Sequence, residues 1–96
     1  MDLLVSYDVS TETRAGRRRL RRVANVCLSY GQRVQKSVFE CTVNEKQLLV
    51  MERRLVAEID LQADSLRIYR LREPRQRNVT VYGLDTYRDL SEPLIF

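Results

Sequence analysis

Histidine is absent from this chain, and glycine and cysteine are scarce. Without an imidazole the chain can have no Ser-His-Asp triad, no histidine base and no histidine metal ligand. Its three glycines stand apart from one another, so the phosphate-binding patterns GxxxxGKS/T and GxGxxG are both missing. Two cysteines cannot form a zinc site by themselves. Most enzyme classes are thereby excluded. Carboxylate and hydroxyl chemistry remains, with arginines to hold an anion.

Long apolar runs are also missing. The first residues, MDLLVSYD, have no basic region and too short an apolar run for a signal peptide or a membrane span. Cys27 and Cys41 each lie within an apolar pattern, which predicts buried thiols and no disulfide framework. The 96 residues make one domain of modest stability, to which a partner chain could contribute. We therefore expect a soluble protein of the reducing cytoplasm, with no membrane partner.

Positive charge is in excess, and nearly all of it comes from arginine. Seventeen Lys and Arg residues against thirteen Asp and Glu residues give a net charge of +4. The planar guanidinium suits two-pronged contact with phosphate better than the ammonium group of lysine does. This balance indicates a nucleic-acid partner. The alternative is a basic surface that serves only solubility.

The pattern of apolar residues predicts the order of the secondary-structure elements. One helix is expected over residues 14–30, followed by Gly31 as its C-cap, and a second over residues 45–60, with Asn44 as its N-cap. The expected extended segments are residues 2–9, the long stretch 32–43, residues 66–72 as a third strand and residues 78–83 as a fourth. We interpret the order as β-α-β-β-α-β, an α+β ferredoxin-like fold with a four-stranded antiparallel sheet and two helices on one face.

The face of the sheet away from the helices is also expected to carry apolar side chains. In LRIYRLR, Leu66 and Ile68 point one way while Tyr69 and Leu71 point the other. Two helices cover only one face, so this pattern predicts a homodimer packed sheet to sheet. The apolar tail that ends at Phe96 predicts a C-terminal edge strand. Residues 1–83 would form the domain, and residues 84–96 a segment that docks at the dimer or partner interface.

The first strand ends in a carboxylate, Asp8. A carboxylate is a hard oxygen ligand that Mg²⁺ or Mn²⁺ accepts. One carboxylate is a poor site, but in a twofold dimer two Asp8 side chains could share one ion, which could activate water for phosphodiester cleavage. The alternative is an Asx turn or a helix N-cap with Ser10 and Thr11, and local sequence alone favours it.

Arginines are concentrated at the start of the first helix, in GRRRLRR. Like charges packed this closely destabilise a helix, so the run indicates an anionic partner such as a phosphate backbone. The alternative is an ordinary solvated helix face. A second, weaker phosphate contact is predicted in the loop REPRQRN. The arginines concerned are Arg17, Arg18, Arg19 and Arg22 in the helix, and Arg75 and Arg77 in the loop.

Three segments together resemble a known family. "SYDVS" at the end of the first strand, "YGQRVQKSVFEC" after the first helix and "DSLRIYRL" in a later strand are similar to the Cas-two family of CRISPR-associated proteins. The resemblance extends over nearly the whole chain, including its length and its short apolar tail.

This resemblance implies a site. The family has a ferredoxin-like fold, forms homodimers and includes metal-dependent nucleases that act on RNA or double-stranded DNA, with Mg²⁺ or Mn²⁺ at paired aspartates. Carried over, the aspartate is Asp8, and Tyr7 and Arg33 would position the substrate. Ser37 and Phe39 would lie by the active cleft, and Ser37 could supply the proton for the leaving oxygen. The basic residues of the first helix fall on Arg18, Arg19 and Arg22.

The resemblance also implies a role without catalysis. The family dimer bridges dimers of the CRISPR integrase during spacer acquisition and grips the phosphates of captured DNA, with a contribution from the segment that corresponds to residues 84–96. Three interpretations therefore stay open at this point. They are a metal-dependent endonuclease in spacer acquisition, a structural DNA-binding adaptor, and a toxin-like endoribonuclease.

Overall fold

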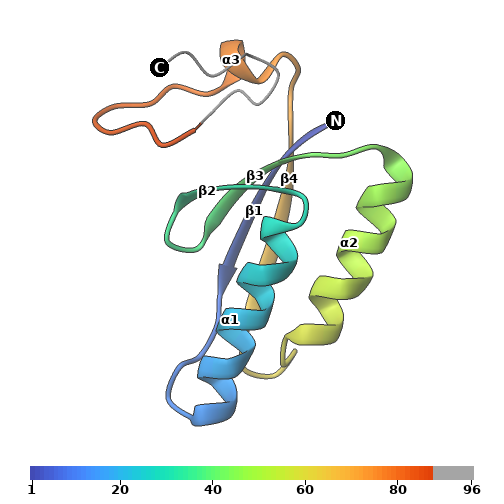
Figure 1. The fold of residues 1–96 in the computed structure, drawn as a ribbon, viewed down its shortest axis with the longest axis vertical. Coiled ribbons are helices and arrows are strands. Elements are labelled where there is room, and N and C mark those ends of the chain that lie inside the picture. Colours follow the sequence, from blue (N-terminus) through green and yellow to red (C-terminus); the bar gives the residue numbers. More distant parts are fainter. Residues whose placement is uncertain (88–96) are drawn as a thin grey trace.

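Four antiparallel strands form one sheet in the order β2-β3-β1-β4, and helices α1 and α2 pack on one of its faces (Figure 1). The computed structural model describes residues 1–87. The elements are β1 (Asp2–Asp8), α1 (Arg14–Leu28), β2 (Gly31–Gln35), β3 (Val38–Thr42), α2 (Glu45–Glu58), β4 (Ser65–Leu71) and α3 (Arg75–Asn78). The β-α-β-β-α-β order and the ferredoxin-like arrangement are confirmed. No helix within these residues is long and apolar enough to cross a membrane.

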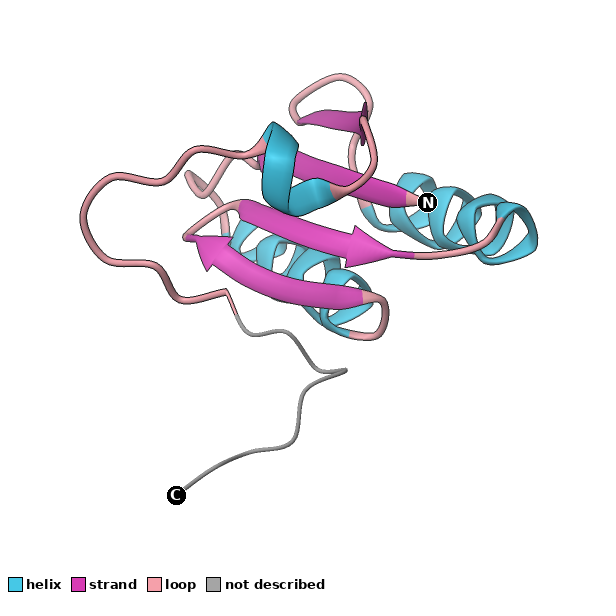
Figure 2. Ribbon diagram, turned by 90° about the horizontal axis from the view of Figure 1, so that it is seen from above, coloured by secondary structure: helices cyan, strands magenta, loops and turns pink. Residues whose placement is uncertain are grey.

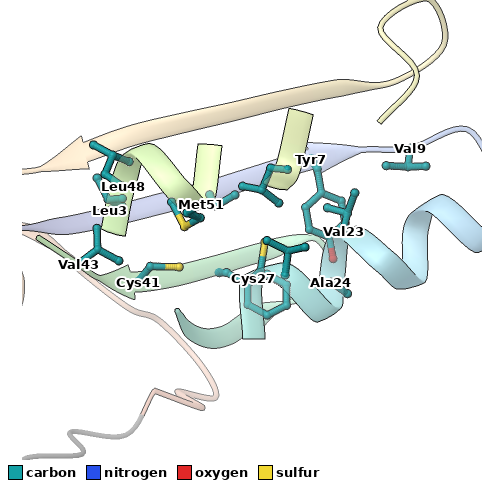
Figure 3. Close-up of a cluster of buried hydrophobic side chains, with 14 residues drawn as sticks. Leu3, Tyr7, Val9, Val23, Ala24, Cys27, Cys41, Val43, Leu48 and Met51 are labelled. Atoms are coloured by element: carbon teal, nitrogen blue, oxygen red, sulfur yellow. The ribbon is translucent and has the colours of Figure 1, made fainter. Parts of the chain in front are cut away.

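The hydrophobic core lies between the sheet and the two helices. In β1 every second residue is buried on this side, namely Leu3, Val5 and Tyr7, as the two-residue period of a strand requires (Figure 3). The helices contribute one apolar stripe each: Val23, Ala24, Val26 and Cys27 from α1, and Leu48, Met51 and Leu55 from α2. The sequence therefore places its apolar residues at the spacing that each element needs.

Both cysteines are buried free thiols in this core, as the sequence predicted. Burial raises the pKa of Cys27 to about 12 and the pKa of Cys41 to about 11. At neutral pH both therefore stay protonated, and neither offers a thiolate to a metal.

The caps of the helices differ in part from the prediction. Thr13 caps α1 by accepting a hydrogen bond from the Gly16 amide at 3.0 Å, and Asn44 caps α2 as predicted. Gly31 is not a C-cap, because α1 ends at Leu28 and Gly31 is the first residue of β2. A side chain there would collide with the carbonyl oxygen of Glu40 and lie 2.6 Å from the Cys41 Sγ. A glycine is needed here because strands β2 and β3 approach closely at this position. It is not needed to end helix α1.

The predicted long stretch 32–43 is a hairpin. It turns at residues 36–37 and pairs β2 with β3, with a register shift between Arg33 and Gln35. This hairpin supplies two of the four strands, so the sheet needs no strand after β4.

The strand predicted over residues 78–83 is wrong. The chain instead forms the short helix α3 and then an irregular segment at the end of the sheet (Figure 2). Arg75 of α3 donates two hydrogen bonds to the buried Glu40 carboxylate, at 3.0 and 2.8 Å, and stacks on Tyr87 at 3.4 Å from the ring centroid. These contacts hold the segment across the sheet, and they override the strand propensity of NVTVYG. The predicted edge strand of the tail lies outside the described residues.

Candidate nucleic-acid interface

The face of the sheet away from α1 and α2 is here called the open face, and it includes Leu4, Ser6, Asp8, Val38, Glu40, Arg67 and Tyr69. Asp8 is the last residue of β1, where it pairs with Ser65 of β4. Its side chain is exposed, in contrast to the buried Tyr7 before it and Val9 after it. Because Thr13 caps α1, Asp8 does not serve as the helix cap.

A single chain does not build a metal site around Asp8. Within residues 1–87, no group of three or more His, Cys, Asp and Glu side chains lies close enough together to hold an ion. Mg²⁺ and Mn²⁺ bind through several oxygen ligands, of which one carboxylate supplies at most two. The donor set therefore fits a metal only where a second carboxylate, such as the Asp8 of another copy, joins the first.

Tyr7 lies on the opposite face of the sheet from Asp8. Its side chain is 4% exposed and points toward α1 (Figure 3). Its hydroxyl is buried and has no hydrogen-bond partner among the described residues. Burial raises the pKa of Tyr7, and the nearby Arg33 guanidinium opposes that increase. Tyr7 also stacks on Phe39 with the ring centroids 6.2 Å apart.

The other residues suggested by the motif lie with Tyr7. The Arg33 guanidinium lies 5.1 Å from the centroid of the Phe39 ring. Ser37, in the turn between β2 and β3, accepts a hydrogen bond from the Tyr7 amide through its carbonyl oxygen at 3.1 Å. The structure therefore brings together Tyr7, Arg33, Ser37 and Phe39, with Arg33 and Phe39 on the helix side of the sheet. Asp8 lies on the other side.

Arginines line a groove of about 600 Å³ beside α1, here called the arginine groove, which consists of Arg18, Arg21, Arg22 and Arg33 around Leu20, Ala24, Asn25 and Leu28. Arg18 and Arg22 were predicted to bind phosphate, and Arg33 was predicted to position the substrate. Arg22 lies 3.8 Å from Glu58, an ion pair too exposed and too long to hold it strongly. The groove thus combines several cationic side chains with an apolar strip, an arrangement suited to a nucleotide.

Two of the arginines that were predicted to contact phosphate are instead bound to buried carboxylates. Arg19 donates to Asp64 at 2.8 Å through its Nε, and Arg75 holds Glu40 as described above. Both arginines are mostly buried, with side chains 21% and 12% exposed. The structure assigns them to tying segments of the chain together. Arg17 donates to the Thr11 carbonyl at 3.2 Å, and Arg77 is exposed on α3.

Asp64 is a structural carboxylate that the sequence reasoning missed. It accepts hydrogen bonds from the Ser10 and Asp60 amides, at 3.0 and 2.8 Å, besides those from Arg19. The guanidinium of Arg19 lowers the pKa of Asp64, and the two amides act in the same direction. The loop after Asp8 is thereby fastened to α1 and to the start of β4. The only signal was the position of Asp64 in "DSLRIYRL", where it looked like part of a polar break.

Arg67 and Tyr69 of β4 were missed as well, although their alternation with Leu66 and Ile68 was visible in the sequence. Both are exposed on the open face, where Arg67 Nη1 donates to the Tyr69 hydroxyl at 2.9 Å. They share with Asp8 the part of the sheet that neither helix covers.

These features define a class of protein. It is a ferredoxin-like domain with a strand-end carboxylate on its open face and an arginine groove beside its first helix. The chain belongs to the Cas2 family of CRISPR-associated proteins, the Cas-two family that its motifs resemble. The model of that family, described as CRISPR associated protein Cas2, matches residues 1–79.

Similar proteins span the full length of the chain. A protein of Moorella thermoacetica, named CRISPR-associated endoribonuclease Cas2 1, is 56% identical over 95 residues, which cover 99% of each chain. The CRISPR-associated endonuclease Cas2 of Halalkalibacterium halodurans is 48% identical over 96 residues, which cover 100% of both. The crystal structure of Streptococcus pyogenes Cas2 matches with a TM-score of 0.79 and 52% identity, over 86% of this chain and 100% of that chain.

Proposed function

We propose that this chain is a metal-dependent endonuclease of CRISPR spacer acquisition, an antiviral defence of the cytoplasm. It acts as a homodimer whose two Asp8 carboxylates share one Mg²⁺ or Mn²⁺ ion. The same dimer binds nucleic-acid backbone and bridges subunits of the CRISPR integrase, through a surface that includes residues 84–96. Membership of the Cas2 family and the nuclease names of its relatives support the first part of this proposal.

The position of Asp8 is the observation that carries the nuclease proposal. It is an exposed carboxylate at the end of a central strand, on a face that the helices leave open and that a twofold-related copy can reach. A structural aspartate would be expected to bind a neighbouring group, as Asp64 and Asp2 do. Two such carboxylates facing one another would repel, and a divalent cation between them removes that repulsion.

Hydrolysis of a phosphodiester adds one water molecule across a P–O bond. The water oxygen bonds to phosphorus, one bridging oxygen leaves, and that oxygen takes up a proton. Bound at the two Asp8 carboxylates, the metal would supply charge neutralisation and an acidified water. Asp8 holds the ion, and the arginines of the chain hold the phosphate backbone. Because the chain has no histidine, the leaving oxygen takes its proton from water or from a hydroxyl such as that of Ser37.

The substrate is a nucleic acid, RNA or duplex DNA. Two curated relatives carry names that differ on this point, one an endoribonuclease and the other an endonuclease. An RNA substrate cleaved outside acquisition would make the chain a toxin-like endoribonuclease. Overexpression that slows growth only when Asp8 is intact would favour that role.

A second function, that of a DNA-binding adaptor without catalysis, is favoured by the arginine groove. Its four arginines lie beside α1 and β2, on the helix side of the sheet, so they can bind phosphates without any contribution from Asp8. An adaptor would depend on these arginines and lose little when Asp8 becomes asparagine.

The experiment compares wild type with Asp8→Asn on labelled duplex DNA and single-stranded RNA, with Mg²⁺, with Mn²⁺ and with chelator. Asp2→Asn is the matched control, because Asp2 lies on the same strand and face and bonds Thr42 at 2.9 Å. We expect metal-dependent cleavage that is lost only in Asp8→Asn, while binding is retained by all three proteins. Equal cleavage by wild type and Asp8→Asn, or binding without cleavage by any of them, would leave the adaptor as the function.

A further inference from the structure

The register of β1 with β4 places an arginine beside Asp8. Asp8 pairs with Ser65, and Ser6 pairs with Arg67, so Asp8 and Arg67 are diagonal neighbours on the open face. Diagonal neighbours of an antiparallel pair lie about 7–8 Å apart, within reach of a long side chain. The motif had pointed to Arg33, but that residue lies on the helix side of the sheet, beside Phe39 and Tyr7.

Arg67 differs from Arg19 and Arg75, which are bound to carboxylates. Within residues 1–87 Arg67 makes no ion pair with a carboxylate. Its hydrogen-bond partner is the neutral hydroxyl of Tyr69, two residues along the same strand and on the same face. That bond raises the pKa of Arg67 further, and the guanidinium keeps its charge. Arg67 is exposed in the single chain, and because a guanidinium has five N–H donors, the bond to Tyr69 leaves others for a ligand.

We propose that Arg67 is the phosphate-binding residue of the Asp8 site and that Tyr69 positions it. Arg67 contacts the non-bridging oxygens of the phosphate that is cleaved, and the charge on those oxygens increases as water attacks. The inference rests on the proposed nuclease function, and it adds to the paired Asp8 carboxylates a protein cation that can hold the anionic substrate. The bond changes are those of the hydrolysis described above, and Arg67 gives up no proton.

The chain offers a matched control in Arg70. It lies on the same strand and is also exposed, but it pairs with Leu3 and is therefore on the opposite face. The experiment measures single-turnover cleavage and equilibrium binding for wild type, Arg67→Ala, Arg67→Lys, Arg70→Ala and Tyr69→Phe. It uses whichever labelled nucleic acid the wild type cleaves, with Asp8→Asn as the inactive reference.

We expect the cleavage rate of Arg67→Ala to fall about 100-fold, the size found when a donor to developing charge is removed. Affinity should fall far less, Arg67→Lys should recover part of the rate, and Arg70→Ala should stay within about twofold of wild type. Tyr69→Phe should lower the rate about 3-fold to 10-fold, because the guanidinium remains but is no longer held. Added guanidinium chloride at millimolar concentration should partly restore Arg67→Ala and leave Arg70→Ala unchanged.

The two proposals fail in different ways. If Asp8→Asn cleaves like wild type, the nuclease function through Asp8 is wrong. If Asp8→Asn is inactive and Arg67→Ala cleaves as fast as Arg70→Ala, only the assignment of Arg67 is wrong. A loss of cleavage in Arg67→Ala that guanidinium does not restore, together with a change of oligomeric state in analytical ultracentrifugation, would also overturn it, because Arg67 would then serve the subunit interface.

Discussion

The two faces of the sheet are built from the same strands but serve different purposes. On the helix side, Leu3, Val5, Tyr7 and Phe39 are almost completely buried and form the core. On the open face, Asp8, Arg67 and Tyr69 are exposed, whereas Glu40 is buried in an ion pair with Arg75 of α3. Tyr7 and Asp8 are neighbours in the sequence, yet the strand separates them to opposite faces. A motif of adjacent residues therefore does not define one site.

The largest effect is expected from removal of a large side chain on the helix side. Phe39 is fully buried and stacks with Tyr7, so Phe39→Ala should lower the free energy of unfolding by about 3–5 kcal/mol. Tyr69→Ala, on the open face, should cost less than about 1 kcal/mol because that side chain is 46% exposed. Urea denaturation of both variants measures the contrast. Similar losses would contradict the assignment of the core to one face.

Arg75→Ala tests the buried ion pair between Arg75 and Glu40 on the open face. It leaves the Glu40 carboxylate without its partner, and the free energy of unfolding should fall by about 3 kcal/mol. Replacing both residues by methionine should cost less than Arg75→Ala alone, because no unpaired charge remains. Urea denaturation of the single and double variants gives the comparison. A double variant less stable than the single one would show that the charges themselves stabilise this face.

Asp64→Asn tests how the loop after Asp8 is held to α1, because Asp64 accepts hydrogen bonds from the Ser10 amide and from Arg19. The variant should be about 2 kcal/mol less stable at neutral pH, because the carboxylate accepts bonds from Arg19 and two amides. The pKa of Asp64 is lowered in the folded state, so its stabilisation is present above the unfolded value of about 3.9 and is lost as pH falls through the folded pKa. Thermal melts between pH 2 and pH 7 should show the difference between wild type and variant shrinking only below about pH 4. A difference that disappears already at pH 6 would assign the effect to another group.

The smallest expected effect is a change in nucleic-acid affinity, and it distinguishes two arginines of α1: Arg18, which lines the arginine groove, and Arg19, which is bound to Asp64. Arg18→Ala in the arginine groove should weaken nucleic-acid binding severalfold and reduce the slope of log affinity against log salt by about one. Arg19→Ala should leave that slope unchanged and lower stability, because Arg19 is bound to Asp64. Fluorescence anisotropy at several salt concentrations measures both. A slope that changes equally in the two variants would place Arg19 in the groove as well.

Much of the fold was predictable because its signals are local. The caps Thr13 and Asn44 precede stripes of apolar residues at helical spacing, and β1 alternates over its whole length. Gly31 and residues 78–83 were misread because their roles depend on distant contacts. Gly31 is required by the approach of β3, and the segment after β4 is held by an arginine that reaches a carboxylate 35 residues away.

The amino-acid sequence was sufficient to establish the family and the β-α-β-β-α-β arrangement, and to single out Asp8 as a candidate metal ligand. It could not say which arginines are free, because a guanidinium in a sequence looks the same whether or not a buried carboxylate binds it. Tertiary structure alone decided that Arg19 and Arg75 hold the fold together and that Arg18, Arg21, Arg22 and Arg33 line a groove. It also placed Arg67 and Tyr69 on the same face as Asp8, because pairing of β1 with β4 brings together residues that lie about sixty positions apart.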